Sequence, residues 1–262
     1  MNIKINRFLF SQTNIDSGSL TPHSTLVCKI TDTGEYQGVV MKGSGIVSRF
    51  RLRVLEERPL NRSPSLSTTN SKEASQHIDE NKQVNDTSNQ INIDLSNIKN
   101  IYTLKKGDYA VFFVSTGAGG YSIELYRFEK GSQIKTFDSK ELKDGLIFSA
   151  MVIRPGTYLI TNTINNAKAD LVVNYPELGK MKKILTPINV ESNAKEIVPN
   201  KINIDPSQGL IFKINALSRI KIELTKPEDR PLKLHREQFI IRTKGDEKFL
   251  KRYRLVPRNQ SL

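Results

Sequence analysis

The chain has few of the residues from which metal and redox centres are built. Among 262 residues there is one cysteine, Cys28, with three histidines and no tryptophan. A single cysteine excludes an internal disulfide framework and any zinc or iron–sulfur site made of several thiolates. The lack of tryptophan removes the aromatic platform that sugar-binding sandwiches usually present. The alternative groups on which a sugar could stack are Tyr102, Tyr109, Tyr121 and Tyr126. Tyr109 and Tyr121 fall within strand patterns that favour burial.

Long apolar runs are also missing. No stretch reaches the 18 or so apolar residues that a membrane-spanning helix needs, and the longest runs are Tyr109–Val114 and Leu146–Ile153. At the N-terminus, Asn6, Arg7 and Ser11 interrupt the apolar core of about 7–15 residues that a secretory signal requires. We therefore expect no signal peptide, no transmembrane segment and a cytoplasmic location, unless a leader has been removed.

Motifs for catalysis are not recognisable. There is no HExxH or GxSxG sequence, and no plausible Ser–His–Asp set. The glycine-rich pieces Lys42–Gly45 and Thr116–Gly120 do not end in GK[ST] and lead into strands, so tight hairpins explain them better than a phosphate loop. The carboxylates Asp138, Glu141 and Asp144 alternate with lysines, which indicates a solvated turn. The sequence therefore predicts a protein that is not an enzyme.

What the chain does contain is a succession of short strand patterns separated by turn residues. Turn signals recur at spacings of about 8–12 residues, which is typical of a sandwich or barrel, and no sustained helical periodicity is present. We predict an all-β protein with a Greek-key β-sandwich. The expected strands are Asn2–Phe10, Thr25–Thr31, Tyr36–Met41, Ile46–Leu55, Ile98–Leu104, Tyr109–Ser115, Tyr121–Phe128, Ile134–Phe137, Leu146–Ile153, Gly156–Thr163, Ala169–Tyr175, Lys183–Val190, Lys195–Ile204, Leu210–Ala216, Arg219–Leu224, Gln238–Thr243 and Lys251–Val256.

Two boundaries divide the sequence. Residues 59–92 have no aromatic residue and no glycine, and they are rich in Ser, Thr, Asn and Gln, so they are predicted to form a disordered insertion. A solvated spacer, a regulatory loop and a short helix around Lys72–Lys82 all remain open there. The second boundary falls near Pro176. We expect residues 1–58 with 93–176 to form the sandwich, and residues 177–262 to form a second β-rich basic domain or, less favoured, an extension of the first.

Two passages resemble the cupredoxin-like β-sandwich. Ile98–Val114 carries an extended strand, a KKGD turn and an apolar strand, and Arg154–Val173 carries a PGTY strand, a loop and a Val-rich strand. The resemblance implies a cupredoxin-like fold, although an immunoglobulin-like sandwich needs similar turns. A third passage, Ile197–Ile214, opens in the same way as the first and hints at a second copy.

The copper ligands of that family are absent. The resemblance implies a cysteine and a histidine just after the PGTY strand, where a blue-copper site takes two His and one Cys. Here Asn162–Asn166 supplies only amides and apolar groups, and Cys28 lies far upstream with His23. His77 and His235 fall in the insertion and the basic tail. We therefore expect no metal and no cofactor.

Charge is the strongest functional signal. Lys and Arg number 40 against 27 Asp and Glu, which gives a formal net charge of +13. Basic residues crowd the last part of the chain, with Phe239, Phe249 and Tyr253 between them, and three arginines alternate along one predicted strand. Such a field attracts an anionic polymer, an acidic protein or an anionic membrane surface, or serves only solubility. The candidate binding residues are Arg49, Arg51, Arg53, Arg242, Lys248, Lys251, Arg252 and Arg254.

Two functions follow from these observations. The first is a non-catalytic binding or assembly module, whose partner is another protein or a second copy, reached through loops and a basic C-terminal surface. The second is a nucleic-acid-associated protein that binds the phosphate backbone without sequence specificity. No recognised nucleic-acid module supports the second hypothesis, because the sequence has no RNP motif, helix-turn-helix or zinc finger.

Overall fold

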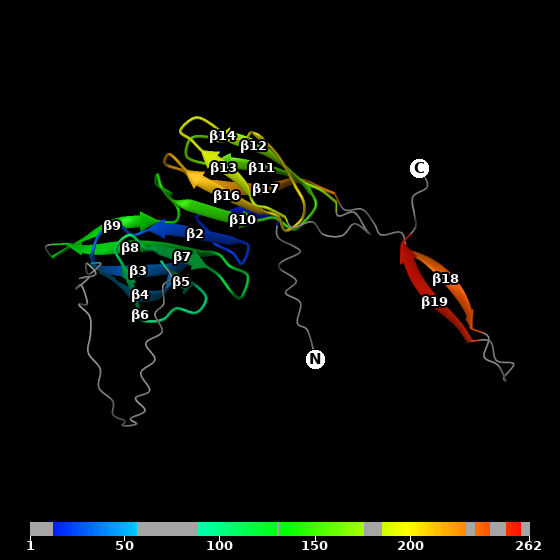
Figure 1. The fold of residues 1–262 in the computed structure, drawn as a ribbon, viewed down its shortest axis with the longest axis horizontal. Helices are drawn as coiled ribbons and strands as arrows, with labels where there is room; N and C mark the ends of the chain where they lie inside the picture. The colour runs from blue at the N-terminus through cyan, green and yellow to red at the C-terminus, as the bar shows by residue number, and fades with distance from the viewer. Residues whose placement is uncertain are drawn as a thin grey trace, which may run out of the picture. The chain divides into compact units, whose positions relative to one another are not determined.

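The structure is a computed structural model that describes residues 13–56, 89–129, 131–175 and 185–228, together with the backbone of two later strands at 234–241 and 250–257. Every regular element among these residues is a β-strand (Figure 1). The predicted all-β class is therefore confirmed, while the Greek-key and cupredoxin-like details stay predictions. In the described part of the chain no helix is long and apolar enough to cross a membrane.

The chain divides into two compact units, Met1–Pro227 and Glu228–Leu262. The larger unit is organised around a mixed seven-stranded sheet. The first and second halves of the unit each contribute strands to this sheet, and they join where β2 pairs antiparallel with β10. In order across this sheet, its strands are β14 (Ile197–Val198), β13 (Ile188–Ser192), β16 (Gly209–Ile214), β10 (Ile147–Met151), β2 (Ser24–Lys29), β7 (Tyr109–Phe113) and β5 (Gln90–Asp94).

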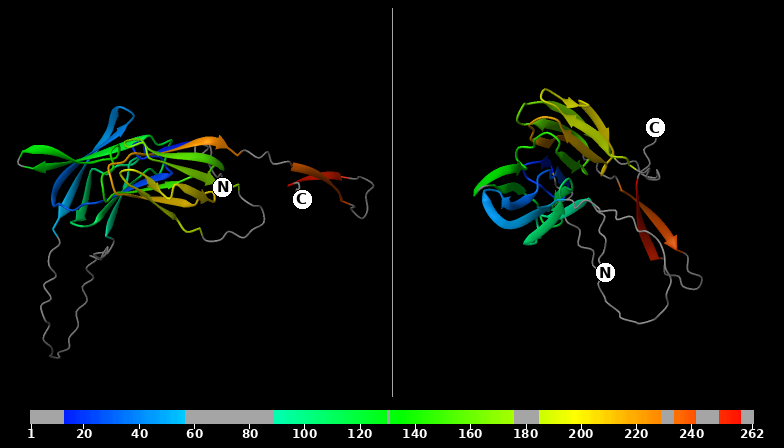
Figure 2. Two further views of the ribbon diagram at one scale, coloured as in Figure 1. Left: turned by 90° about the horizontal axis from the view of Figure 1, so that it is seen from above. Right: turned by 60° about the vertical axis from the view of Figure 1, so that its left-hand side comes forward.

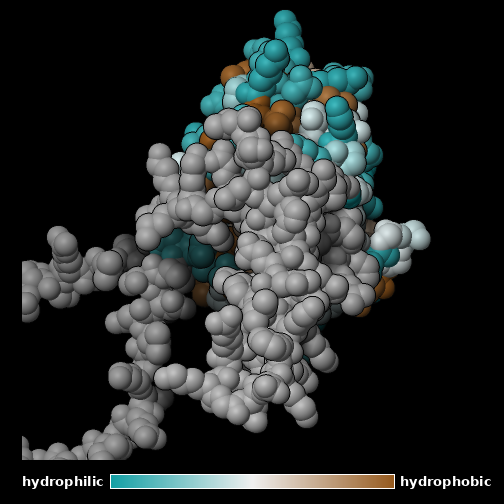
Figure 3. Space-filling view, turned by 90° about the vertical axis from the view of Figure 1, so that its right-hand side faces the viewer, coloured by the Kyte–Doolittle hydropathy of each residue, from teal (hydrophilic) through white to brown (hydrophobic). Residues whose placement is uncertain are grey.

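Two five-stranded sheets complete the larger unit. The first five-stranded sheet has the order β6 (Ile101–Lys105), β4 (Gly45–Leu55), β3 (Gly34–Lys42), β8 (Tyr121–Glu129) and β9 (Ser132–Asp138). The second five-stranded sheet has the order β1 (Asn14–Asp16), β17 (Ile220–Pro227), β11 (Gly156–Asn162), β12 (Lys168–Val173) and β15 (Lys201–Ile204). The outer surface left visible in Figure 3 is largely hydrophilic with scattered apolar residues, as expected for sheets with one solvated face.

Both five-stranded sheets cover the same face of the seven-stranded sheet. Leu26 of β2 and Phe148 of β10 are register partners and so lie on one face, and both are fully buried in the common core. Phe112 of β7 stacks on Phe137 of β9 with ring centroids 5.4 Å apart, which joins the seven-stranded sheet to the first five-stranded sheet. The second five-stranded sheet contacts the same face in the other repeat, where the side-chain amide of Asn162 in β11 donates a hydrogen bond to the hydroxyl of Ser192 in β13 (3.3 Å).

The two halves of this unit repeat one topology. In the first half β2 pairs with β7 and β7 pairs parallel with β5, and the second half repeats this with β10, β16 and β13. In the same way, the parallel pair of β4 with β6 corresponds to the parallel pair of β12 with β15. We call β1–β8 the first repeat and β9–β17 the second repeat; in Figure 2 most of each repeat forms one of two adjacent lobes, blue to green and green to orange.

Equivalent side chains make equivalent contacts in the two repeats. The hydroxyl of Tyr36 donates to Asp32 O (2.8 Å), and that of Tyr158 donates to Arg154 O (2.7 Å). Ser17 exchanges two hydrogen bonds with the backbone of Ile220 (2.9 and 3.1 Å). Ser139 does the same with Ile123 (2.9 and 3.0 Å). These matched contacts set the alignment of residues 15–36 with 137–158, which shares Asp, Ser, Leu, Gly and Tyr at equivalent positions.

The first strand of each repeat lies on the other repeat. Strand β1 opens the chain but pairs with β17, the last strand of the second repeat. Strand β9 opens the second repeat but pairs with β8, the last strand of the first. Asp16 at the end of β1 also forms a two-point ion pair with Arg219, whose Nη2 lies 2.8 Å from Oδ2. This exchange explains why the repeats form one unit rather than two independent domains.

The strands between Pro176 and Pro227 therefore belong to the first unit, which agrees with the less favoured alternative of an extension rather than with a separate domain. β13 and β16 extend the seven-stranded sheet, and β15 and β17 belong to the second five-stranded sheet, so this part of the chain extends the first unit. The division lies after Pro227 instead. Beyond it, β18 (Leu234–Ile241) and β19 (Leu250–Pro257) pair antiparallel as a hairpin. Most of the predicted insertion lies outside the described residues, although its last part contributes to β5 from Gln90.

Candidate functional site

The three arginines of β4 lie in a row on the outer face of the first five-stranded sheet. Strand residues alternate between faces, and Phe50, Leu52 and Val54 point into the core with at most 3% of their surface exposed. The intervening residues Arg49, Arg51 and Arg53 are all exposed. The arginine row was predicted from the sequence as one face of a strand, and the structure places it so.

The members of the arginine row differ in their partners. Arg53 pairs with Glu35 on the neighbouring strand, where Nη2 lies 3.1 Å from Oε1. Arg49 and Arg51 have no ion pair with any residue that the structure describes. Two guanidinium groups therefore present their donors outward, and each can make charge-assisted, two-point hydrogen bonds to a carboxylate or a phosphate.

Apolar side chains border the arginine row. Ile101 of the edge strand β6 is the register neighbour of Arg51 and is 57% exposed. Leu55 continues the row beyond Arg53 and is 47% exposed. At the other end Ile46 and Val47 of the β3–β4 hairpin are each 53% exposed. The face thus combines unpaired arginines, a residue type enriched at protein interfaces, with exposed aliphatic groups.

The second repeat provides an internal comparison for the arginine row. Leu52 and Leu171 occupy equivalent positions, because they pair with Tyr102 and Ile202 on the equivalent strands β6 and β15. The residues of β12 that correspond to the row are therefore Lys168, Asp170 and Val172, all exposed. Because the same fold accepts a cation, an anion and an aliphatic residue at these positions, folding alone does not require three arginines.

Two acidic groups on the same sheet, Glu124 and Asp138, are engaged by Lys135 rather than by the arginine row. Lys135 of β9 lies 2.8 Å from Asp138 and 3.5 Å from Glu124. The hydrogen bond to Asp138, together with the negative charges of Asp138 and Glu124, raises the pKa of Lys135 above its usual range. Burial acts in the opposite direction, but its effect is smaller. Glu124 also accepts a hydrogen bond from Tyr126 (2.5 Å).

The three carboxylates considered in the sequence, Asp138, Glu141 and Asp144, do not form a cluster. Asp138 accepts a hydrogen bond from the backbone N–H of Lys140 and so stabilises a turn. Glu141 and Asp144 are exposed.

The C-terminal candidates belong to the second unit or lie outside the described residues. Lys251, Arg252 and Arg254 are on β19, where Arg252 is the register partner of Phe239 and Arg254 that of Glu237. Arg242 and Lys248 fall outside the described residues. The structure therefore brings together Arg49, Arg51 and Arg53, and does not relate them to the basic tail.

The residues considered for metal chemistry serve the core. Cys28 is buried, and this burial raises the pKa of its thiol to about 12, so it is neither a ready nucleophile nor a ready metal ligand. Asn162 is fully buried and hydrogen-bonds Ser192 and Ser218 (3.3 and 2.9 Å), which closes a polar network between strands. Within the described ranges no group of three His, Cys, Asp or Glu side chains is placed to hold a metal ion.

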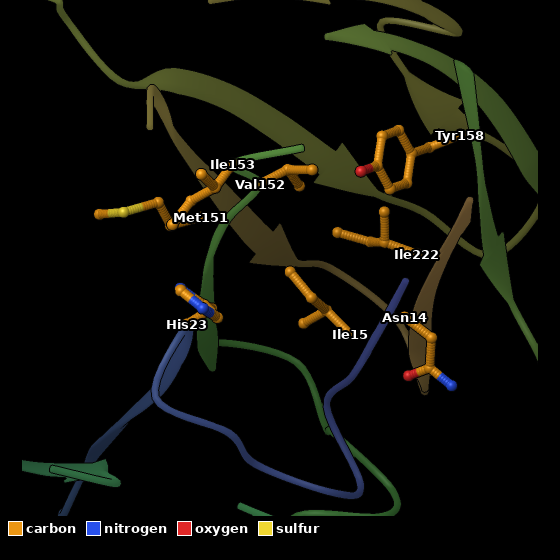
Figure 4. A pocket seen from close by; sticks show the side chains of 8 residues that line it. All are labelled: Asn14, Ile15, His23, Met151, Val152, Ile153, Tyr158 and Ile222. Carbon is orange, nitrogen blue, oxygen red and sulfur yellow. The ribbon is translucent and has the colours of Figure 1, made fainter. Parts of the chain in front are cut away.

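His23 lines a small hollow that sequence reasoning did not single out. Its side chain is 9% exposed, and its Nε2 has no hydrogen-bond partner among the described residues. Figure 4 shows Ile15, Met151, Tyr158 and Ile222 among the residues around the hollow, so apolar groups dominate it. The space inside is about 10 Å³, which suffices for about one water molecule. The hollow is therefore too small for an organic ligand.

The setting of His23 predicts a pH-dependent stability. Burial lowers the pKa of this imidazole below its usual range, so the unfolded chain binds the proton more tightly than the folded chain does. We expect the free energy of unfolding to fall as the pH drops from 7 to 5, and His23→Leu to remove most of this loss. Urea unfolding at several pH values measures both. An unchanged slope in His23→Leu would contradict the assignment.

Comparisons with known proteins add no relative. No family model, no characterised protein and no solved structure gave a significant match to the chain. The cupredoxin-like resemblance therefore stays a prediction.

Proposed function

We propose that the protein is a non-catalytic binding module that recognises an acidic protein segment through the outer face of the first five-stranded sheet. The observation that carries this proposal is the pair of exposed guanidinium groups, Arg49 and Arg51, which have no acidic partner among the described residues. The equivalent strand of the second repeat lacks such a pair, because Asp170 stands at the position of Arg51.

The apolar border favours a protein over a nucleic acid. Ile101 and Leu55 are exposed beside the row, and aliphatic side chains of a partner segment can pack on them while its carboxylates meet the arginines. Single-stranded nucleic acid is usually held by aromatic side chains on which bases stack. Two aromatic residues lie on this face: Tyr126 is only partly exposed and is hydrogen-bonded to Glu124, and Phe128 near the end of β8 is 49% exposed. A single well-exposed ring offers little stacking surface beside the aliphatic border, so nucleic acid is the second candidate, bound mainly through phosphates.

A direct comparison of probes tests the proposal. We expect a labelled short peptide of alternating glutamate and valine to bind the full chain more tightly than single-stranded DNA of similar charge, as measured by fluorescence anisotropy at physiological salt. A glutamate–serine peptide of equal charge is the matched control, and it should bind less tightly because it lacks the aliphatic groups. Tighter binding of the DNA than of the peptide would overturn the proposal in favour of the second candidate.

A further inference from the structure

The opposite face of the seven-stranded sheet is covered by no other described strand. Both five-stranded sheets pack on the face that carries Leu26 and Phe148, so the adjacent residues along the chain, Val27 and Ile147, point to the other side. The same face continues across β7 through Val111, the partner of Val27, and across β16 through Ile211, the partner of Ser149. It therefore spans both repeats, on either side of the β2–β10 pair.

This outer face has an apolar centre. Val27, Val111, Phe113, Ile147 and Ile211 are all partly exposed, and they are not among the partly buried residues that pack against the core. Polar residues flank them on β5 and β13, although Val198 of the edge strand β14 is also exposed on this face. On β5 the polar residues are Gln90, Asn92 and Asp94, and on β13 they are Asn189 and Glu191.

The outer faces of the other two sheets carry more charge, although the first five-stranded sheet also exposes aliphatic groups beside its arginine row. That of the first five-stranded sheet carries the arginine row and the Lys135 cluster, and that of the second carries Lys168, Asp170 and the ion pair of Lys221 with Glu223 (2.7 Å). A solvated sheet face is normally polar along each strand. The apolar centre of the seven-stranded sheet departs from that pattern, as a contact surface does.

Charge and size indicate what kind of partner fits this face. It carries two lysines, Lys29 and Lys213, and two acids, Asp94 and Glu191, so it is formally neutral although the whole chain has a net charge of +13. Seven strands about 4.8 Å apart and about five residues long cover roughly 600 Å² in projection. That is of the order of the roughly 800 Å² per partner that a stable interface buries.

We propose that a second copy of the chain docks on this face, so that two seven-stranded sheets pack against each other. A neutral apolar patch is complementary to itself, and it is the surface through which two strongly basic molecules approach with the least local repulsion. Sheets that pack face to face interdigitate such aliphatic side chains at a separation of about 10 Å. The proposal is independent of the arginine row, which lies on another sheet.

Sedimentation velocity of the full chain tests this dimer. We expect the weight-average mass to rise from 29.7 kDa toward twice that value as the concentration increases from about 1 to about 100 µM, where interfaces of ordinary affinity assemble. Val111→Glu is expected to raise the dissociation constant at least about tenfold. The milder pair Ile147→Thr and Ile211→Thr retains β-branched side chains and should act in the same direction.

Val172→Glu is the matched control, because Val172 is an exposed valine on the outer face of the second five-stranded sheet. It should leave the dissociation constant unchanged. Circular dichroism shows whether each variant keeps its strand content. A wild-type chain that stays at 29.7 kDa over the whole range overturns the proposal, and so does equal weakening by Val172→Glu. Binding of the glutamate–valine peptide to the arginine row is measured in a separate experiment, at concentrations where the chain is monomeric. Each proposal can therefore fail without the other.

Discussion

Replacing Arg49 and Arg51 together by glutamate is expected to weaken binding of the glutamate–valine peptide by about 100-fold. Both guanidinium groups are exposed, so each contact with a carboxylate contributes only about 1 kcal/mol or slightly more. Reversal of the charge adds repulsion, and about 1.4 kcal/mol per position corresponds to a factor of ten in the dissociation constant. Fluorescence anisotropy with the same peptide measures the effect.

A matched pair of substitutions separates a local contact from the general field of a basic protein. Lys168→Glu with Lys201→Glu changes the net charge by the same amount on the outer face of the second repeat, where both residues are exposed. If the arginine row binds the peptide, this pair weakens binding only a few-fold. Equal losses in the two double variants would mean that net charge alone attracts the peptide.

Phe112→Ala is expected to lower the free energy of unfolding by about 3–5 kcal/mol. The ring is fully buried and stacks on Phe137 between two sheets, so its removal leaves a cavity at the centre of the first repeat. A loss of this size is a large share of the roughly 5–15 kcal/mol that stabilises an ordinary folded protein. Urea unfolding followed by circular dichroism gives the difference.

The next residue is the natural control for this prediction. Phe113 has the same side chain but lies on the outer face of the seven-stranded sheet and is partly exposed. Measured at concentrations where the chain is monomeric, Phe113→Ala should cost less than about 1 kcal/mol. A cost for Phe113→Ala as large as that for Phe112→Ala would contradict the assignment of the inner and outer faces.

The class of the fold could be predicted because its signal is local. Alternation along β4 placed Phe50, Leu52 and Val54 opposite the three arginines, and turns such as the one around Gly107 separated the strands correctly. These features depend only on neighbouring residues, and pleating converts them directly into two faces. The arginine row was therefore found from the sequence alone.

The duplication and the exchanged strands could not be predicted in the same way. The sequence showed only a likeness between Ile98–Val114 and Ile197–Ile214, because most equivalent positions share character rather than identity: Tyr102 corresponds to Ile202 and Leu104 to Ile204. Pairing of β1 with β17 joins residues about 200 positions apart, and alternation in a strand does not name its neighbour. For that reason a separate domain after Pro176 was favoured over an extension of the first, whereas β13 to β17 extend the first unit.

The outer face of the seven-stranded sheet was hidden for a related reason. Val27 and Val111 look like core residues in their own strands, and only the pairing of β2 with both β7 and β10 shows that they share an uncovered face. A strand that is apolar on both sides indicates burial on both faces. The alternation of residues along one strand shows that its second face is apolar, but it does not show which other strand or molecule covers that face.

Site-specific photo-crosslinking tests the central claim most directly. Thr103 on β6 is exposed beside Arg53, and Asn203 on β15 is its counterpart in the second repeat. A photoreactive residue at position 103 is expected to crosslink the glutamate–valine peptide with a yield about tenfold higher than the same residue at position 203. Equal yields at the two positions, or a higher yield at 203, would show that the arginine row is not the binding surface.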